Sequence, residues 1–404
     1  MARPHVRLVD IRELSQAAKE LKRVGANGRS WEIMAPKAIF KVLKVSDLPF
    51  PAATVIKQEM LALGADAAVA RGVITARVKR SDVLIMGTVG QLERLAHKIA
   101  AQPFGLDRLS TEIQRVIADL RSPHQRQLHC RGKVLSIGQR PLIMGVLNLT
   151  PDSFSDGGQF NALERAIPRA HEMVAQGADI IDVGGESTRP GAQPIPLDEE
   201  LRRVIPVVER LSAELKVPIS VDTYKAEVAD RALKAGVHIV NDISALRFDQ
   251  RMSQVVAENK AALVLMHMKG TPRNMQRNPR YDDVMQEIIQ FLAQQLQKAE
   301  EAGISRSRLI VDPGIGFGKR VQDNLTILNR LGELHTLGVP VLVGVSRKSF
   351  IGKVLDLPVE DRLEGSAAAT ALAVTRGAHM LRVHDVKEMN RVVQMAHAIS
   401  VAMG

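Results

Sequence analysis

The sequence predicts an α/β fold in which a (β/α)8 TIM barrel follows a small α+β N-terminal domain. Eight short apolar runs alternate with amphipathic segments from Pro141 to the end of the chain. Strands that alternate with helices form parallel sheets, and eight such units over about 260 residues are typical of a TIM barrel. Each run also ends in hydrogen-bonding or ionisable residues, as barrel strands do at an active site. A doubly wound open sheet is the alternative, because a sequence does not show whether a sheet closes.

The first 121 residues lack this rhythm and predict a separate small domain. Helices are expected at 10–24, 51–63, 91–101 and 110–121, and residues 37–45 form an apolar-rich segment. Residues 72–79 alternate like a half-exposed strand, and residues 82–87 have the composition of its buried neighbour. Residues 122–140 are expected to connect this domain (1–121) to the barrel (141–404).

Within the barrel, the apolar runs predict the strands and the amphipathic segments predict the helices between them. Strands are expected at 141–147, 179–184, 218–222, 238–241, 262–267, 308–312, 340–345 and 380–384. The helices expected between them include 161–176, 198–214, 225–235, 281–302 and 321–333.

The composition favours a basic enzyme that attracts an anionic small molecule. The chain carries a formal net charge of +11, and residues 1–120 hold 19 Lys and Arg against 12 Asp and Glu. Only 3% of the residues are aromatic and the basic residues are scattered, so nucleic-acid binding is disfavoured. Cys130 is the only cysteine, which excludes a disulfide framework and favours a reducing compartment, the cytoplasm. No apolar stretch approaches the roughly 18 residues of a membrane span.

Polar side chains follow every expected strand of the barrel. These strand ends are Asn148; Gly185–Gly191; Asp222–Lys225; Asn241 and Asp242; His267–Lys269; Asp312–Gly314; Ser346–Ser349; and Arg382–His384. Each has an ordinary structural explanation when taken alone: Asp222 can cap a helix, and Asp312 before Pro313 can belong to a turn. Because the carboxyl ends of barrel strands meet on one face, eight such endings together predict one functional site.

One group of these residues suits a phosphate or diphosphate. Arg382 and Arg189 offer the planar fork that binds phosphate oxygens, and His384 lies close to Arg382 in sequence. The amide oxygen of Asn148 can bind a Mg²⁺ ion that keeps most of its waters.

A second group suits a flat heterocycle. Asp222, Asn241 and Asp312 suit a ring with N–H donors, because a carboxylate can accept two N–H bonds from its edge, and Lys348 can meet a ring carbonyl. Met266 and Phe317 can line an aromatic pocket, with core packing as the even alternative for each. The site therefore predicts a ligand with an aromatic donor edge at one end and phosphates at the other.

Three common catalytic motifs are absent from the sequence. The segment Gly314–Lys319 is similar to a phosphate-binding P-loop, but Pro313 and Arg320 stand where that motif needs Gly and Ser or Thr. No His-Glu-x-x-His zinc motif and no Gly-x-Ser-x-Gly nucleophile elbow occurs. Lys348 as a Schiff-base nucleophile is a minor alternative.

In order along the chain, these segments resemble the dihydropteroate synthase family of folate enzymes. The matching motifs are Asn148–Gly158 (NLTPDSFSDGG), Gly184–Gly191 (GGESTRPG), Ser220–Tyr224 (SVDTY), Asn241–Ile243 (NDI), Leu265–Met268 (LMHM), Asp312–Gly318 (DPGIGFG), Ser346–Ser349 (SRKS) and Arg382–Asp385 (RVHD). They span about residues 135–402 without a missing segment. The resemblance implies that 4-aminobenzoate is joined to (7,8-dihydropterin-6-yl)methyl diphosphate, with release of diphosphate.

The resemblance also implies a role for each site residue. The pterin would be held by Asp222, Asn241, Asp312 and Lys348, and Mg²⁺ by Asn148. The diphosphate would face Thr188, Arg382 and His384, and the aminobenzoate would lie among Arg189, Pro190, Phe317 and Ser349. Asp222, Lys348, Arg382 and His384 are the expected catalytic residues. The loops 149–160 and 186–197 are expected to close over the reacting groups, and the parts played by Asp152 and Phe154 are left open.

Two other functions are compatible with a pterin-binding barrel. A methyl-tetrahydrofolate:corrinoid methyltransferase could use Asp222, Asn241 and Asp312, but it would not need the motifs at 188–190, 346–348 and 382–384 that suit an anionic leaving group. A catalytically idle pterin-binding protein would have lost a site residue, and none is missing. The N-terminal domain is a departure from the barrel-only form of the family, with stability or oligomerisation as its expected role. A homodimer is expected.

Overall fold

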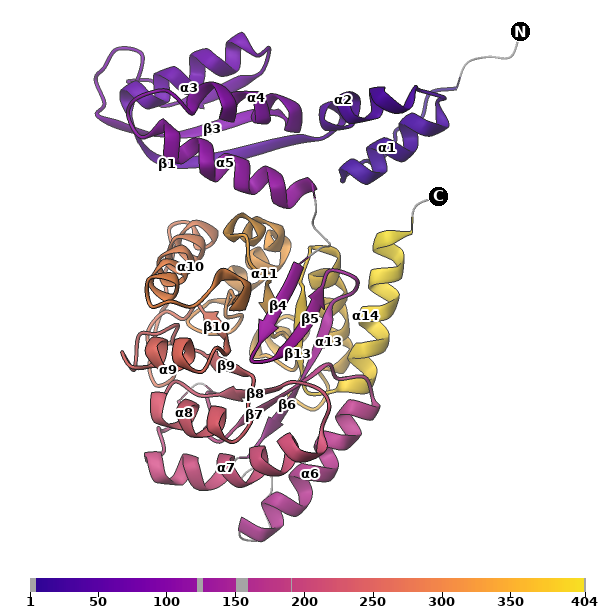
Figure 1. Cartoon of the computed structure of the whole chain (residues 1–404), viewed down its shortest axis with the longest axis vertical. Coiled ribbons are helices and arrows are strands. Elements are labelled where there is room, and N and C mark those ends of the chain that lie inside the picture. The colour runs from indigo at the N-terminus through magenta and orange to yellow at the C-terminus, as the bar shows by residue number, and fades with distance from the viewer. Residues whose placement is uncertain (1–4, 122–125, 150–158, 190, 403–404) are drawn as a thin grey trace. The chain divides into compact units, whose positions relative to one another are not determined.

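The computed structural model describes residues 5–121, 126–149, 159–189 and 191–402. It divides into two compact units, Met1–Pro123 and His124–Ala402, and Figure 1 shows the elements of each. None of the helices in the described residues is long and apolar enough to cross a membrane.

The first unit is a three-stranded antiparallel sheet with helices. Its strands are β1 (Phe40–Pro49), β2 (Asp66–Val69) and β3 (Arg80–Thr88), in the order β1-β3-β2. Its helices are α1 (Leu14–Arg23), α2 (Gly28–Ala38), α3 (Phe50–Ala62), α4 (Val89–Ile99) and α5 (Leu106–Arg121). Ile56, Met60, Ile85 and Leu92 form part of a core with no exposed surface. The unit is therefore a small α+β domain, as predicted.

One local prediction for this unit is wrong, and one helix was missed. Residues 72–79 form turns rather than a strand, because Ala76 has a φ of 52° that interrupts an extended backbone, and β2 at 66–69 pairs with β3 instead. Helix α2 was not predicted; it begins at the Asn27 side chain, which accepts a hydrogen bond from the Arg29 amide.

The second unit is a parallel eight-stranded barrel. Its strands are β6 (Leu142–Asn148), β7 (Ile180–Gly184), β8 (Ile219–Asp222), β9 (Ile239–Asp242), β10 (Ala262–Met266), β11 (Leu309–Asp312), β12 (Leu342–Val343) and β13 (Met380–Val383). They are hydrogen-bonded in the order β11-β10-β9-β8-β7-β6-β13-β12, and a parallel bridge between Val311 and Val341 joins the two ends. The open-sheet alternative is therefore wrong, and the barrel is confirmed.

The outer layer of this unit is helical. Its helices are α6 (Gln159–Ala175), α7 (Leu197–Glu214), α8 (Ala226–Lys234), α9 (Met252–Glu258), α10 (Val284–Glu301), α11 (Val321–Asn329), α12 (Ser349–Leu355), α13 (Leu363–Thr375) and α14 (Val386–Val401), with short 3-10 helices at η2 (Arg306–Arg308) and η3 (Leu331–Leu337). The predicted strand 340–345 shortens to β12, and the predicted helix 321–333 ends at Asn329 before η3.

A hairpin closes the N-terminal end of the barrel. The segment expected to be a plain connection forms β4 (Arg126–Cys130) and β5 (Lys133–Ile137), which pair antiparallel. Leu128, Cys130 and Ile137 pack against the first residues of the barrel strands, among them Ile180 and Ile239. Because this end of the barrel is filled by apolar side chains, the polar side chains collect at the opposite, C-terminal end.

Candidate active site

The sequence-predicted residues that the structure describes lie at or just beyond the C-terminal ends of the barrel strands. Asn148, Asp222, Met266 and Asp312 are the last residues of β6, β8, β10 and β11; Asn241 and Arg382 lie within β9 and β13; and Thr188, Arg189, Phe317, Lys348, Ser349 and His384 lie in the segments that follow β7, β11, β12 and β13. Pro190, Asp152 and Phe154 lie outside the described residues.

Arg382 is the centre of a buried network that joins four strands. Its Nε donates to Oδ2 of Asp182 and its Nη2 donates to Oδ2 of Asp222, both at 2.7 Å. The amide of Asn241 also donates to Oδ2 of Asp182, at 3.1 Å. Asp182 is fully buried and was not predicted. The sequence did hold one indication of its role, because Asp182 is a carboxylate inside the apolar run Ile180–Val183. A charge buried in a strand is costly unless a hydrogen-bonding or charged partner lies beside it inside the barrel.

Asp222 has a free acceptor and a strongly perturbed charge. Among the residues that the structure describes, its Oδ1 is buried without a hydrogen-bond partner. Burial raises the pKa of Asp222 to about 7, against the attraction of Arg382 and with further repulsion from Asp182. A buried acceptor left open in the folded protein is a position where a ligand N–H can bind.

Asp312 and Lys348 form the other side of the site. Burial raises the pKa of Asp312, while its Oδ1 accepts a hydrogen bond from the Gly314 amide at 2.7 Å. Burial lowers the pKa of Lys348 to about 8, against the attraction of Asp312. The Lys348 ammonium donates to the Ile315 carbonyl and lies 4.7 Å from the centre of the Phe317 ring. The carboxylate, the ammonium and the ring therefore form one polar and aromatic wall.

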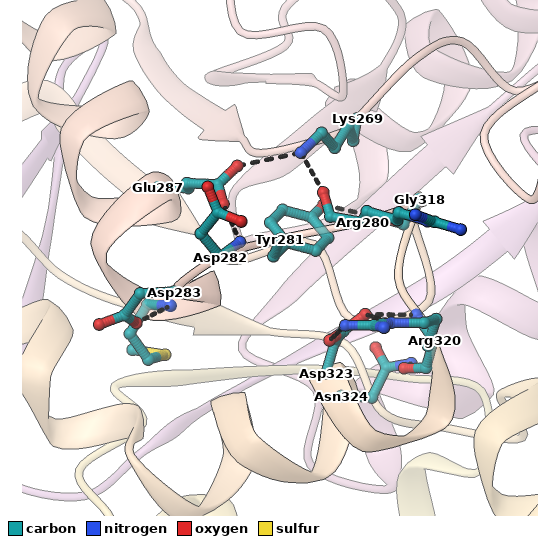
Figure 2. Close-up of polar contacts among 11 residues, drawn as sticks. Lys269, Arg280, Tyr281, Asp282, Asp283, Glu287, Gly318, Arg320, Asp323 and Asn324 are labelled. Atoms are coloured by element: carbon teal, nitrogen blue, oxygen red, sulfur yellow. Dashed lines mark hydrogen bonds and ion pairs between the residues drawn. The ribbon is translucent and has the colours of Figure 1, made fainter. Parts of the chain in front are cut away.

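The glycines between Asp312 and Lys319 allow two loops to touch. Gly314 has a φ of +67°, and a Cβ there would lie 2.0 Å from the His267 carbonyl oxygen. Gly318 has a φ of +63°, and a Cβ would lie 2.4 Å from the Lys269 carbonyl oxygen. Hydrogen bonds add to this close packing. The Tyr281 hydroxyl donates to the Gly318 carbonyl at 2.7 Å, and the Lys269 ammonium lies between Glu287 and the Arg280 carbonyl (Figure 2). The glycine pattern serves this close packing.

The Lys319 side chain hydrogen-bonds to both of these loops. This role of Lys319 was not predicted from the sequence. Its buried ammonium lies 3.0 Å from Nδ1 of His267, and it donates to the carbonyls of His267 at 3.3 Å and Phe317 at 3.0 Å. Burial lowers the pKa of Lys319 well below its usual value. Burial also lowers the pKa of His267, to about 2, so its ring is neutral and its Nδ1 can accept from the ammonium. These bonds hold Phe317 at the mouth of the site.

His384 is a neutral hydrogen-bonding group. Burial lowers its pKa to about 4, and the charges of Arg382 and Arg189 lower it further. Its Nδ1 lies 3.1 Å from the Ser346 hydroxyl. The neighbouring Arg347 is not directed to a ligand, because it forms a bidentate ion pair with Asp385 at 2.7 and 2.9 Å.

Three predicted residues lie outside the buried network. Thr188 is half-buried, whereas Arg189 and Ser349 are exposed. Within the described part of the chain, no hydrogen bond links them to Arg382, Asp222 or Asp312. Their positions suit contact with a ligand that fills the mouth of the barrel.

The donor set offers few protein ligands for a metal ion. No group of three or more His, Cys, Asp or Glu side chains is placed to hold a metal within the ranges that the structure describes. Asn148 pairs with Gly184 across the β6–β7 boundary, and its Oδ1 would lie 3.7 Å from a Cβ at that glycine. One amide oxygen at the mouth fits a Mg²⁺ ion that takes its other ligands from water and phosphate oxygens.

Known proteins match the barrel closely. A family model described as pterin binding enzyme matches residues 144–384. The dihydropteroate synthase of Bacillus subtilis (strain 168) is 48% identical over 272 residues, which is 67% of this chain and 93% of that protein. A solved structure of Xanthomonas albilineans dihydropteroate synthase with 4-aminobenzoic acid has a TM-score of 0.65 and 46% identity, and it covers 69% of this chain and 100% of that one.

A third match extends beyond the barrel. A probable bifunctional folylpolyglutamate synthase/dihydropteroate synthase of Halobacterium salinarum is 41% identical over 389 residues, which is 96% of this chain and 46% of that protein. A match of that length includes most of the N-terminal unit. With these identities spread over the whole barrel, the chain belongs to the pterin-binding enzymes, in the dihydropteroate synthase family.

Proposed function

We propose that this enzyme condenses (7,8-dihydropterin-6-yl)methyl diphosphate with 4-aminobenzoate to give 7,8-dihydropteroate and diphosphate. The observation that carries the proposal is the open acceptor of Asp222, opposite Asp312 and Lys348, inside a barrel of this family. The methyltransferase alternative is not favoured, because the relatives compared above are dihydropteroate synthases over the full barrel.

In this proposal the pterin ring lies between the two buried carboxylates. Asp222 and Asp312 accept N–H bonds from the ring, Asn241 hydrogen-bonds its edge and Lys348 donates to its carbonyl. Met266 is buried against Phe317 in one apolar cluster, which suits a flat ring.

The leaving group and the second substrate lie above the pterin. Thr188, Arg382 and His384 face the diphosphate, and Arg189, Pro190, Phe317 and Ser349 surround the aminobenzoate. The bond between the pterin methylene carbon and the diphosphate oxygen breaks, and its electron pair leaves with the diphosphate. The arylamine nitrogen then bonds to that carbon and loses a proton to solvent. The barrier is charge separation, so the fixed charge of Arg382 lowers it without a strong general base.

Mg²⁺ is the proposed cofactor, held by Asn148 and the diphosphate oxygens. When bound, it would neutralise charge that develops on the leaving group. The position of Asn148 at the mouth of the barrel, beside the strand that ends near Asp222, supports this assignment.

A homodimer in the cytoplasm is the proposed state of the enzyme. Exposed apolar side chains lie on or beside three helices that pack together, α11, α12 and α13. They are Leu325, Val354, Leu355, Val359 and Leu372. Exposed apolar side chains on neighbouring helices are the observation that supports an interface on this face. Sedimentation of the Leu372→Glu variant as a monomer would support it, and an unchanged dimer would place the interface elsewhere.

Calorimetric binding of 6-hydroxymethylpterin tests the pterin site. The Asp312→Asn variant should bind at least about tenfold more weakly, because one accepting carboxylate oxygen becomes an NH2 group that can only donate. The matched control is Asp385→Asn, which alters a carboxylate paired with Arg347 and should leave pterin affinity unchanged. Equal affinity of wild type and Asp312→Asn would contradict the assignment.

A further inference from the structure

A single ammonium group joins the two ends of the segment between β7 and α7. Lys225 follows β8, and its Nζ donates to Oε2 of Glu186 at 2.7 Å and to the Ile195 carbonyl at 2.8 Å. Glu186 stands at the start of that segment and Ile195 at its end. A third bond, 2.6 Å to Oε2 of Glu200, ties the same ammonium to the first turn of α7. We call these four residues the Lys225 clasp.

The clasp is protected from water. The side chains of Lys225, Glu186 and Glu200 are 19%, 7% and 1% exposed, which sets them apart from the surface ion pairs of the helices. Burial lowers the pKa of Lys225, but the hydrogen bonds to Glu186 and Glu200 outweigh it and the net change is upward. The ammonium therefore stays charged, and ion pairs buried to this degree are costly to break from one side only.

Three further contacts fix the clasp on the barrel. The Tyr224 hydroxyl donates to the other carboxylate oxygen of Glu186, and the Lys225 ammonium lies 5.5 Å from the centre of the Tyr224 ring. Arg203 of α7 donates to the Gly185 carbonyl at 3.0 Å. The segment is therefore anchored near both of its ends, at Glu186 and Ile195, and Thr188 and Arg189 lie between these two anchors in the sequence.

We infer that Lys225 is a positioning residue for the second, aromatic amine substrate. By closing the base of the segment, it sets the position of Arg189, which borders the aminobenzoate in the proposed site. Within the described residues, no hydrogen bond or ion pair joins the Lys225 side chain to Arg382, Asp222 or Asp312. The clasp reaches the pterin pocket only more weakly, through the charge of Glu200, which raises the pKa of Asp222, and through the packing of Tyr224 beside Met266. The inference rests on the proposed function, and it predicts that loss of Lys225 separates arylamine binding from pterin binding.

The test uses the full chain with Lys225→Met, which keeps the length of the side chain and removes its charge. Because this variant leaves two buried carboxylates without their cation, the double variant Lys225→Met/Glu200→Gln is measured beside it. The control is Lys234→Met, which removes an exposed lysine that pairs with Asp230 on α8. Three quantities are measured: amide hydrogen exchange in peptides spanning 186–197, KM and kcat with 4-aminobenzoate, and calorimetric binding of 6-hydroxymethylpterin.

In both Lys225 variants, amide hydrogens in peptides spanning 186–197 should exchange at least about tenfold faster than in wild type, and those elsewhere little faster. The reason is that Lys225 no longer restrains local opening of this segment. The KM for 4-aminobenzoate should rise by about tenfold or more, with kcat and pterin affinity each changed by less than about threefold. The control should match wild type.

Unchanged exchange in 186–197 would overturn the inference, as would an equal loss of pterin affinity, or unfolding of both variants. A wild-type protein without turnover would instead contradict the proposed function, and the exchange measurement would still decide whether Lys225 holds the segment.

Discussion

Asp182 accepts a hydrogen bond from Nε of Arg382 at 2.7 Å, and this contact links β7 to β13 over the strand between them, β6. Asp182 has no exposed surface, and Arg382 also pairs with Asp222. Both carboxylates are buried and the Arg382 side chain is only 22% exposed, so the two ion pairs fix the direction of the guanidinium before any ligand binds. Burial lowers the pKa of Arg382, but these two carboxylates outweigh it and the net change is upward. Its charge is therefore permanent.

Asp182→Asn should lower kcat by about 10- to 100-fold, since a charge-assisted hydrogen bond contributes about 1.5–3 kcal/mol and the amide replaces it poorly. Pterin affinity should fall less, because Asp312 and Lys348 remain. Asp179→Asn is the matched control: Asp179 forms a bidentate pair with Arg140 at the other end of the barrel. If the Asp182→Asn variant kept the wild-type kcat, catalysis would not depend on Asp182 to orient the Arg382 guanidinium.

The pH dependence of kcat/KM for the pterin substrate should be bell-shaped. Asp222 must be ionised to accept an N–H bond, and its raised pKa of about 7 means that activity falls as the pH drops below that value. Lys348 must be protonated to donate, and its lowered pKa of about 8 means that activity falls above it.

The acid side of this profile also tests the role of Asp182. Its charge raises the pKa of Asp222, so Asp182→Asn should move the acid limb to lower pH. Lys348→Arg should remove the alkaline limb, because arginine does not lose its proton there. A flat profile from about pH 6 to about pH 9 would contradict both assignments.

The hairpin formed by β4 and β5 determines how much of the N-terminal part of the chain can be removed without loss of stability. Removal of residues 1–123 should leave a folded barrel with kcat within about twofold of the full chain, since its core is separate. Removal of residues 1–140 also deletes the fully buried Leu128 and Ile137. This cut should cost several kcal/mol, roughly as much as two large core truncations. Urea unfolding of both proteins measures the difference, and equal stability would show that the hairpin is dispensable.

The barrel could be predicted because its strands are buried on both faces. Such strands appear as apolar runs, and a polar residue at each end marks the edge of the core. Asn148, Asp222 and Asp312 were found in this way, at the ends of β6, β8 and β11. Site residues that directly follow an apolar run could therefore be predicted from the sequence.

The missed features depend on partners that are distant in sequence. Asp182 was hidden inside a strand, and its partner Arg382 is 200 residues away. Lys225 and Lys319 look like ordinary lysines, and only the folded structure shows that one meets Glu186 and the other meets His267. The hairpin was missed because its strands are short and its turn is Arg131–Gly132, with φ values of 42° and 83°. The glycine was its only local signal.

The most direct test of the proposed function is product formation from both substrates. Purified protein is mixed with (7,8-dihydropterin-6-yl)methyl diphosphate, 4-aminobenzoate and Mg²⁺, and dihydropteroate and diphosphate are measured together. The account predicts equal molar amounts of the two products, formed only when both substrates are present and largely lost in the Asp312→Asn variant. A folded wild-type protein that releases no diphosphate, or releases it without making dihydropteroate, would contradict the account.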